Sequence, residues 1–324
     1  MKPQPCLLIA AALLSACTAT APDTADLQAA LSDDWPRPRA EDALFLGAGD
    51  IARCGRQLAD ARATGDLIRG FLGSFEEARV FTAGDNAYEE GTAAQFADCY
   101  EPTWGSFNDR TLPSPGNHDY RILPPPYFDY FVHYRNDPAA KTRGYYSFDL
   151  KDWHIVSLNS NIAMDAASPQ IQWLESDLGA TQQPCILGVW HHPLFSSGEH
   201  GAESGDAGRR TGPLWEALER HGADVIVNGH DHHYERFAPQ DHDGTATPQG
   251  IRQFVVGTGG AHLRDVLRPL RKNSEFHDDE RHGILALTLR PDSYMWAFFD
   301  IDGDVVDRSA VPVACHAPIS LPSR

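Results

Sequence analysis

The chain has 324 residues, of which 42% are apolar, and a formal net charge of −18. This apolar content is sufficient for a hydrophobic core, and the length suits one large domain or two small ones. The acidic charge argues against binding to a nucleic-acid duplex, which depends on clustered positive charge. Any phosphate site in this chain must therefore be locally positive, and no obligate protein partner is predicted.

The first forty residues have the pattern of a targeting segment followed by a tether. A short apolar run over 7–14 is too brief to span a bilayer. It ends in Leu14-Ser15-Ala16-Cys17, which resembles the lipobox of bacterial lipoproteins, where the cysteine is acylated after cleavage. We therefore expect a signal peptide over 1–16, a flexible tether over 17–40, and an exported protein anchored to a bacterial membrane through lipidated Cys17. The alternative is an ordinary secretory signal that is cleaved nearby.

Strand-like and helical stretches alternate early in the chain, and strand-like runs lie closer together later. Strands are predicted at Leu44–Gly47, Arg79–Ala83, Tyr145–Leu150, Trp153–Leu158, Cys185–Trp190, Val225–Asn228, Gln253–Gly257, Ile284–Leu289 and Tyr294–Phe299. Helices are predicted at Gln57–Gly70, Thr92–Tyr100, Pro169–Leu178 and Pro213–Arg220. We expect one catalytic domain over 41–324, of the α/β (α+β) class, with two mixed sheets packed face to face and helices outside.

Potential metal ligands lie in five short segments, most of which follow an apolar run. They are Gly49-Asp50, Gly84-Asp85-Asn86-Ala87-Tyr88, Gly116-Asn117-His118-Asp119, His191-His192-Pro193 and Gly229-His230-Asp231-His232. Side chains at the ends of neighbouring strands can converge on one rim of a sheet, where α/β folds place their sites. This set of carboxylate, amide, phenol and imidazole groups suits two metal ions, an arrangement typical of phosphate-ester hydrolysis.

The carboxylates of Asp50 and Asp85 each follow a glycine at a predicted strand end. Asp85 has two oxygens with which to bridge both ions, and Tyr88 lies close enough in the chain to bring its phenolate to one of them. His118 can donate a proton, with Asp119 orienting its imidazole. Taken singly, these residues are also common in ordinary turns or in packed cores, and it is their combination that indicates a metal site.

The histidines of the later segments complete the predicted site. His191 follows a strongly apolar strand, and alternation places the rings of His230 and His232 on one side of an extended backbone. Residues beside these ligands are candidates for substrate contacts or for orienting the rings: His192, His233, Arg236, Asp231 and Glu235. The run His277-Asp278-Asp279-Glu280 is predicted to be a solvated acidic loop.

In this order, the segments resemble the calcineurin-like metallophosphoesterase superfamily, nearest its purple acid phosphatase branch. The resemblance runs from about Gly49 to Phe237, with a further turn at Gly257-Thr258-Gly259-Gly260. It implies a first, ferric ion held by Asp50, Asp85, Tyr88 and His232. It implies a second ion, zinc, manganese or iron, held by Asp85, Asn117, His191 and His230.

The branch is indicated by the absence of a histidine in the first segment. Many members of the superfamily read Asp-x-His there, whereas this chain has Ala52, which cannot act as a ligand. Tyr88 supplies the replacement donor, as in the purple acid phosphatases, although these usually have glycine in place of Ala52. The segment Ser197-Gly198-Glu199-His200-Gly201 resembles a loop of small purple acid phosphatases that carries a second active-site histidine. His200 is therefore expected to join His118, the alternative being a solvent-exposed loop histidine.

The resemblance and the ligand set together predict a hydrolase of small phosphate monoesters. A metal-held hydroxide would attack phosphorus in line, and His118, with His200, would protonate the leaving alcohol. A phosphodiesterase or nucleotidase using the same metals is the nearest alternative. A non-catalytic metal-binding lipoprotein is the alternative from another class.

Four cysteines remain in the exported protein if Cys17 is lipidated. An even number in an oxidising compartment favours two disulfides, and sequence alone permits three pairings. We favour Cys54–Cys99, because each cysteine closely follows a ligand segment and the bond would brace neighbouring loops. Cys185–Cys315 would then tie a core strand to the C-terminal tail. Zinc binding by these thiols is disfavoured because no Cys-x-x-Cys spacing is present.

Overall fold

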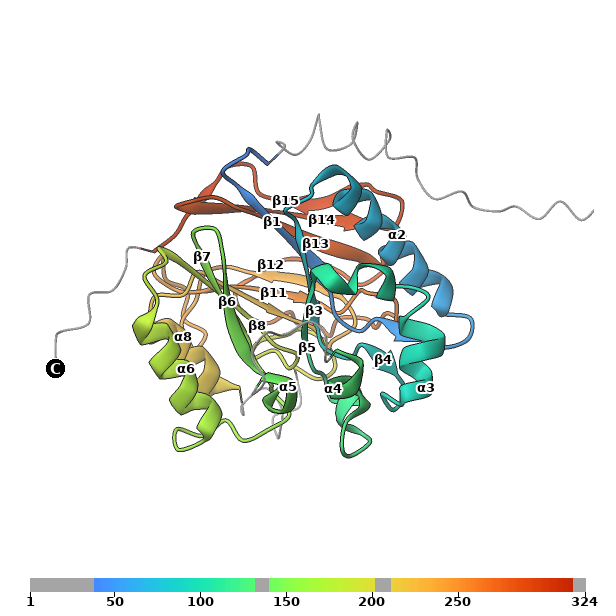
Figure 1. The fold of residues 1–324 in the computed structure, drawn as a ribbon. Coiled ribbons are helices and arrows are strands. Elements are labelled where there is room, and N and C mark those ends of the chain that lie inside the picture. Colours follow the sequence, from blue (N-terminus) through green and yellow to red (C-terminus); the bar gives the residue numbers. More distant parts are fainter. Residues whose placement is uncertain (1–37, 132–139, 202–210, 317–324) are drawn as a thin grey trace, which may run out of the picture.

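Two seven-stranded mixed sheets pack face to face in the computed structural model, which describes residues 38–131, 140–201 and 211–316 (Figure 1). The predicted signal peptide, Cys17 and most of the tether lie outside these residues. Within the described part of the chain, no helix is both long enough and apolar enough to cross a bilayer.

The first sheet contains strands from both ends of the chain. Its order is β15–β14–β13–β1–β3–β5, with β16 also paired to β14. β1 runs parallel to β3, and β3 runs parallel to β5, whereas β13 pairs antiparallel with β1. The strands are β1 (Ala43–Ala48), β3 (Arg79–Ala83), β5 (Thr111–Ser114), β13 (Gly283–Leu289), β14 (Ser293–Asp300), β15 (Val305–Arg308) and β16 (Val313–Ala314).

The second sheet is formed by the middle of the chain, in the order β12–β10–β11–β9–β8–β7–β6. Its central strands β7, β8, β9 and β11 are parallel, and antiparallel pairs lie at both edges. The strands are β6 (Tyr146–Leu150), β7 (Trp153–Ser157), β8 (Cys185–Val189), β9 (Val225–Asn228), β10 (Tyr234–Phe237), β11 (Arg252–Val256) and β12 (Ser274–Asp278). A two-stranded ribbon, β2 (Ala52–Arg53) and β4 (Ala87–Tyr88), lies beside the ligand loops.

Apolar side chains on the two faces of β8 belong to two different cores, because successive residues of a strand point to opposite faces. Leu187 and Val189 pack in the core shared with the first sheet, whereas Ile186 packs in a second core beneath the outer helices. On the outer face of the first sheet, the ring of Phe71 lies 5.1 Å from that of Phe299. The central strands of both sheets are thereby buried on both faces, whereas the edge strands β6, β12 and β15 are partly exposed.

The helices cover the outer faces and fill the loops. α2 covers the first sheet, and α6 and α8 cover the second (Figure 1). As predicted, α6 begins after a Ser168 cap, whose hydroxyl accepts a hydrogen bond from the Ile171 amide. The helices are α2 (Leu58–Ser74), α3 (Ala93–Gln95), α4 (Pro126–Tyr130), α5 (Ala140–Arg143), α6 (Pro169–Ala180) and α8 (Gly212–Arg220). The π-helix is η1 (Phe96–Tyr100), and the 3-10 turns are η2 (Gly105–Arg110) and η3 (His118–Tyr120).

Both predicted disulfides are confirmed: Cys54 is bonded to Cys99, and Cys185 to Cys315. The first ties the residue that follows β2 to the π-helix, close to the ligand loops. The second ties β8 to the C-terminal segment, as the sequence suggested.

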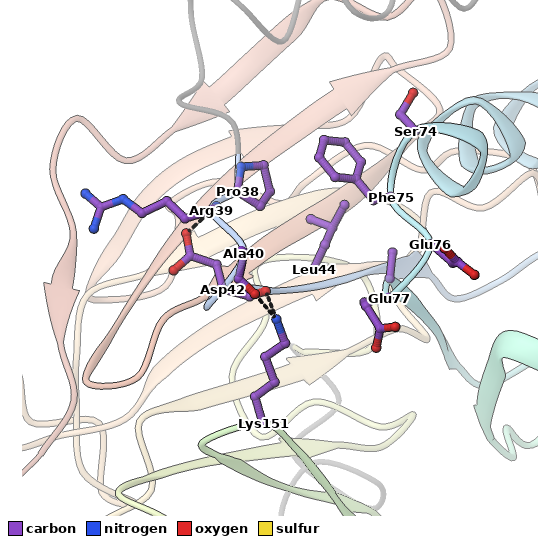
Figure 2. A pocket seen from close by; sticks show the side chains of 11 residues that line it. Pro38, Arg39, Ala40, Asp42, Leu44, Ser74, Phe75, Glu76, Glu77 and Lys151 are labelled. Carbon is purple, nitrogen blue, oxygen red and sulfur yellow. Dashed lines mark hydrogen bonds between the residues drawn. The ribbon is translucent and has the colours of Figure 1, made fainter.

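A hollow of about 270 Å³ lies where the described chain begins, at Pro38 (Figure 2). Lys151 closes one side of it by donating hydrogen bonds to the carbonyl oxygens of Ala40 and Asp42, at 2.6 and 2.7 Å. The hollow lies near the starts of β1 and β3, whereas the candidate ligands follow the ends of these strands. The described chain therefore enters the domain at the end of the strands opposite the candidate site.

The run His277-Asp278-Asp279-Glu280 was predicted to be a solvated acidic loop, and this prediction is wrong for its first two residues. His277 and Asp278 lie in β12, where they pair with Glu235 and Tyr234 of β10, and Asp278 is buried. The Asp278 carboxylate accepts hydrogen bonds from the amides of Glu280 and Arg281, so the charge is satisfied by the turn that follows. The cluster of charged residues obscured a short edge strand.

Candidate metal centre

The candidate ligands converge because the two sheets place the ends of their parallel strands at the same rim. Asp50 follows β1 and Asp85 follows β3 of the first sheet, while His191 follows β8 and His230 follows β9 of the second. Main-chain hydrogen bonds join these ends: the Asp50 amide donates to the Gly84 carbonyl, and the Gly229 amide donates to the His191 carbonyl. The predicted segments thus form one cluster.

Three candidate ligands have left-handed backbone conformations, which are uncommon outside glycine. The φ angles are 60° at Asp50, 51° at Asp85 and 73° at His230. Neighbouring glycines leave room for the carboxylates, because a Cβ on Gly116 would lie 2.1 Å from an Asp85 oxygen, and one on Gly229 would lie 2.6 Å from an Asp50 oxygen. Such local strain is typical of functional sites.

One half of the cluster surrounds the Tyr88 hydroxyl. This oxygen lies 2.6 Å from Asp50 Oδ1, 3.0 Å from Asp85 Oδ2 and 3.2 Å from His232 Nε2. The other ring nitrogen of His232, Nδ1, lies 2.6 Å from the carbonyl oxygen of His262, which fixes Nε2 toward the site. Burial, with the charges of Asp50 and Asp85, raises the pKa of Tyr88 well above its usual value. Without a metal, the tyrosine is therefore a neutral donor.

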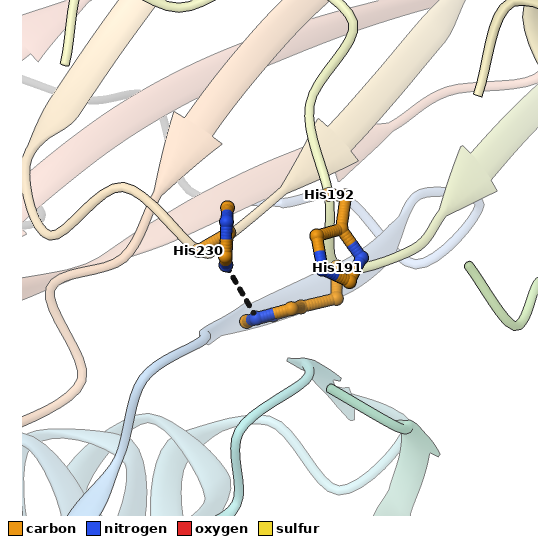
Figure 3. Close-up of side chains that lie close together, drawn as sticks. All are labelled: His191, His192 and His230. Carbon is orange, nitrogen blue, oxygen red and sulfur yellow. Dashed lines mark hydrogen bonds between the residues drawn. The ribbon is translucent and has the colours of Figure 1, made fainter. Parts of the chain in front are cut away.

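The other half surrounds His191 Nε2. This nitrogen lies 3.0 Å from Asn117 Oδ1, 3.2 Å from Asp85 Oδ2 and 3.2 Å from His230 Nδ1. His191 Nδ1 donates to the Ala83 carbonyl at 2.8 Å, so the ring presents Nε2 to the site. Figure 3 shows His191 and His230 meeting in this way, with His192 beside them.

Asp85 joins the two halves, since its Oδ2 contacts both Tyr88 and His191. Burial raises the pKa of this carboxyl, but the charges of His191 and His118 outweigh it and leave the pKa well below its usual range. Conversely, burial lowers the pKa of His191, but Asp85 and Asp50 raise it to about 9. Without a metal, protonated His191 thus offsets only one of the two buried carboxylate charges.

This donor set fits metal ions. Asp50, Asp85 and Tyr88 are at most 2% exposed, and two buried carboxylates are unfavourable unless a cation compensates them. Ligand atoms of Asp50, Asp85 and His191 all lie within 4.8 Å of one another. The seven predicted metal ligands are all in the cluster: Asp50, Asp85, Tyr88, Asn117, His191, His230 and His232.

His118 lies at the edge of the cluster, with its ring packed on Tyr88 at a centroid distance of 4.4 Å. Its Nδ1 lies 2.5 Å from the Glu89 carbonyl oxygen, and its Nε2 lies 3.9 Å from Asp85 Oδ2. The predicted contact between Asp119 and this imidazole is wrong. The Asp119 carboxylate instead accepts hydrogen bonds from the Gly116 amide at 2.8 Å and from the Asn86 side-chain amide at 2.9 Å.

Asp119 points away because consecutive residues of a helical turn do not face each other, and η3 begins at His118. Its carboxylate lies beneath the loop that carries Asn117, and it also accepts from the Asn86 backbone amide at 3.1 Å. Burial and the charge of Asp85 raise the pKa of Asp119 to about 7. Asp119 therefore holds the ligand loops together and has no direct contact with the predicted proton donor.

His200 lies on the opposite side, with its ring 4.3 Å from that of His230. Arg264, which the sequence did not single out, places Nη1 2.6 Å from His200 Nε2. His262 was also missed, and both residues closely follow the Gly257–Gly260 turn, which was the available signal. Because the His200 ring is packed in this way, the alternative of a solvent-exposed loop histidine does not apply.

The residues that flank the ligands have supporting contacts. His192 Nδ1 lies 2.7 Å from the Ser160 hydroxyl, and Glu235 lies 3.2 Å from His233 Nε2. Asp231 accepts from the His200 amide at 3.1 Å, so it positions the His200 loop. Arg236 makes its contacts away from the cluster, since its guanidinium pairs with Asp307 at 2.8 Å.

Residues 24–234 match the model of the calcineurin-like phosphoesterase family, and the chain belongs to this family. It is 30% identical to purple acid phosphatase 21 of Arabidopsis thaliana over 215 residues, which are 59% of this chain and 48% of the relative. It is 24% identical to Fe(3+)-Zn(2+) purple acid phosphatase 12 of the same plant over 240 residues, which are 64% and 51% of the two chains. The chain spans about half the length of these relatives.

Two solved structures share the fold. Purple acid phosphatase PPD1 from yellow lupin (Lupinus luteus) has a TM-score of 0.68 at 20% identity, covering 84% of this chain and 54% of the lupin chain. GAP50, the anchor in the inner membrane complex of Plasmodium, has a TM-score of 0.64 at 14% identity, covering 86% and 90%. The predicted superfamily, its purple acid phosphatase-like branch and the predicted fold class are confirmed.

Proposed function

We propose that this protein is a metal-dependent hydrolase of phosphate monoesters. The main support for this proposal is the position of Asp85 between two groups of buried donors, one around Tyr88 and one around His191. A shared carboxylate between two such groups suits a pair of metal ions. Family membership supports phosphoester chemistry at this site.

Asp50, Asp85, Tyr88 and His232 would hold one ion, and Asp85, Asn117, His191 and His230 would hold the other. We propose iron with zinc, manganese or a second iron, which the tyrosine donor and the likeness to an Fe(3+)-Zn(2+) enzyme support. When bound, the two metals would offset the phosphate charge and make hydroxide available near neutral pH.

The chain's own residues would bind the ester and move the proton. The Glu89 carbonyl accepts from His118 Nδ1 and so leaves Nε2 directed toward the site. In this orientation, His118 would protonate the leaving alcohol. His200, beside His230 and Arg264, would contact the phosphate from the other side. No covalent phosphoenzyme is expected, because the attacking group would be hydroxide made available by the metals, and no serine or cysteine nucleophile is indicated among the described residues of the site.

The test compares hydrolysis of an aryl phosphate monoester and the corresponding bis-ester by metal-loaded protein. We expect faster monoester hydrolysis, abolished in Asp85→Asn and Asn117→Ala variants whose circular dichroism is unchanged. Faster cleavage of the bis-ester would favour a phosphodiesterase, and bound metal with no ester cleavage would favour a non-catalytic protein. The likeness to GAP50 concerns the fold alone and does not choose between these functions.

We further propose that the protein is exported and anchored in the cell envelope through lipidated Cys17. The Leu14-Ser15-Ala16-Cys17 motif and the two disulfides support this location. Radiolabelled palmitate should be incorporated into the wild-type protein and not into Cys17→Ser. Equal labelling of both would contradict the anchor.

A further inference from the structure

A groove of about 480 Å³ lies beside the candidate metal centre. One wall is the start of the His200 loop, and the other is the segment that follows Arg264. A hydrogen bond of 2.7 Å from the Leu267 amide to the Ser197 carbonyl joins the two walls. The volume is within the range of sites for small molecules. Its lining residues are Ser196, Ser197, Gly198, Leu267, Arg268, Pro269, Leu270, Arg271 and Lys272.

The charge of this groove is opposite to that of the protein as a whole. The chain has 45 acidic residues and 27 lysines and arginines, yet the lining contains three cations and no carboxylate. All three cations, Arg268, Arg271 and Lys272, are exposed. In the described part of the chain, none of them forms an ion pair with a carboxylate. Arg268 instead contacts His277 at 3.0 Å, and Arg271 contacts the Ser196 carbonyl at 3.2 Å.

Hydrogen bonds link both sides of the groove to the segments that carry the candidate ligands. On one wall, Ser196 donates to Asp231 at 2.5 Å, beside the ligands His230 and His232. On the other, the Arg264 amide donates to the His232 carbonyl at 2.9 Å, and its guanidinium contacts His200. The nearby acidic residue Glu199 lies 3.5 Å from Arg264 and is not part of the groove lining.

We propose that the groove binds a second phosphate group of the substrate, so that the preferred substrates are small phosphate monoesters with at least one further phosphate. This inference rests on the proposed hydrolase function. One phosphate would occupy the metal centre beside His118 and His200, while the other lies against Arg268 and Lys272. Clustered cations at a groove attract polyanions even when the net charge of the protein is negative. Arginine also suits phosphate through its planar set of donors.

The experiment compares kcat/KM for fructose 6-phosphate, fructose 1,6-bisphosphate and myo-inositol hexakisphosphate at low ionic strength. Substrates with more than one phosphate should be preferred roughly tenfold or more, and added salt should reduce this preference. Arg268→Gln and Lys272→Gln should each reduce the preference roughly fivefold, whereas Lys272→Arg should retain it. The matched control is Arg308→Gln on the edge strand β15, which should not change any of the three values.

Equal kcat/KM values for the three esters, or a preference unchanged in both groove variants, would overturn the inference. In either case, hydrolysis of fructose 6-phosphate would still support the proposed function. If no ester is cleaved, the proposed function fails. Calorimetric titration of myo-inositol hexakisphosphate then decides the inference independently. Binding that is weakened roughly fivefold by Lys272→Gln and retained by Lys272→Arg supports phosphate binding in the groove. Equal binding by the wild-type protein and both variants overturns it.

Discussion

Replacing Tyr88 by phenylalanine removes one oxygen from the centre of the candidate site. The side chain is 2% exposed, and its hydroxyl lies within 3.2 Å of Asp50, Asp85 and His232. In metal-free protein, losing this donor should cost about 1–2 kcal/mol, because a buried carboxylate loses a hydrogen bond. In metal-loaded protein, the variant would also lose the proposed ligand of one ion.

The loss of stabilisation by bound metal determines how far the Tm of the variant should fall. Free metal at 100 times its dissociation constant stabilises the folded state by about 2.7 kcal/mol. If Tyr88→Phe weakens metal binding at one position about a hundredfold, most of that stabilisation is lost, which lowers Tm by roughly 3–5 °C for a domain of this size. Thermal unfolding with and without added metal measures the difference directly.

Tyr234→Phe is the matched control. Tyr234 is also fully buried, and its hydroxyl donates to Asp307 at 2.8 Å, away from the candidate ligands. It should lose a similar amount of stability in metal-free protein and should keep the full stabilisation by metal. Equal stabilisation of both variants by metal would contradict a role for Tyr88 in metal binding.

Three further predictions concern other parts of the molecule. His118→Gln should lower kcat about 10²–10⁴-fold while metal content stays unchanged; a normal kcat would remove its role as proton donor. Burial opposes the charged form of His154, but hydrogen bonds to Asp177 and Asp149 raise its pKa. The ion pairs should therefore stabilise the fold below the unfolded pKa of 6.5 and be lost as pH rises through the folded value. Hence His154→Gln should lower the free energy of unfolding by about 1–3 kcal/mol at pH 5.5 and by less at pH 9, and equal losses would contradict this. Replacing Cys185 and Cys315 by alanine should cost about 2–5 kcal/mol in urea unfolding, and an unchanged midpoint would show that this bond contributes little.

The central strands were predictable because their residues are apolar and β-branched over the right length. The predicted strands at Arg79–Ala83 and Val225–Asn228 have the observed bounds of β3 and β9, and the other predicted strands begin and end within one residue of the observed ones. β5 was not predicted, because Pro113 disfavours a strand except at a sheet edge, which is where β5 lies. The helix predicted over Thr92–Tyr100 changes to a π-helix at Phe96, a change of hydrogen bonding that residue pattern does not report.

The site was predictable to the extent that its donors lie in short segments next to strand ends. Asp50 and His232 are far apart in the chain and meet because β1 and β9 end at one rim, which is a general property of such sheets. The direction of the Asp119 carboxylate was not predictable, because it depends on the turn at η3. Arg264 was missed for a related reason: only the folded chain brings it to His200.

The measurement that tests the central claim most directly is the metal content of the purified protein, taken together with its visible spectrum. We predict two metal ions per chain, with a tyrosinate-to-iron absorption band that disappears in Tyr88→Phe. Asp85→Asn should reduce the content of both ions, because this carboxylate contacts both halves of the site. A fully active protein that contains no metal, or whose metal content is unchanged by Asp85→Asn, would contradict the proposed centre.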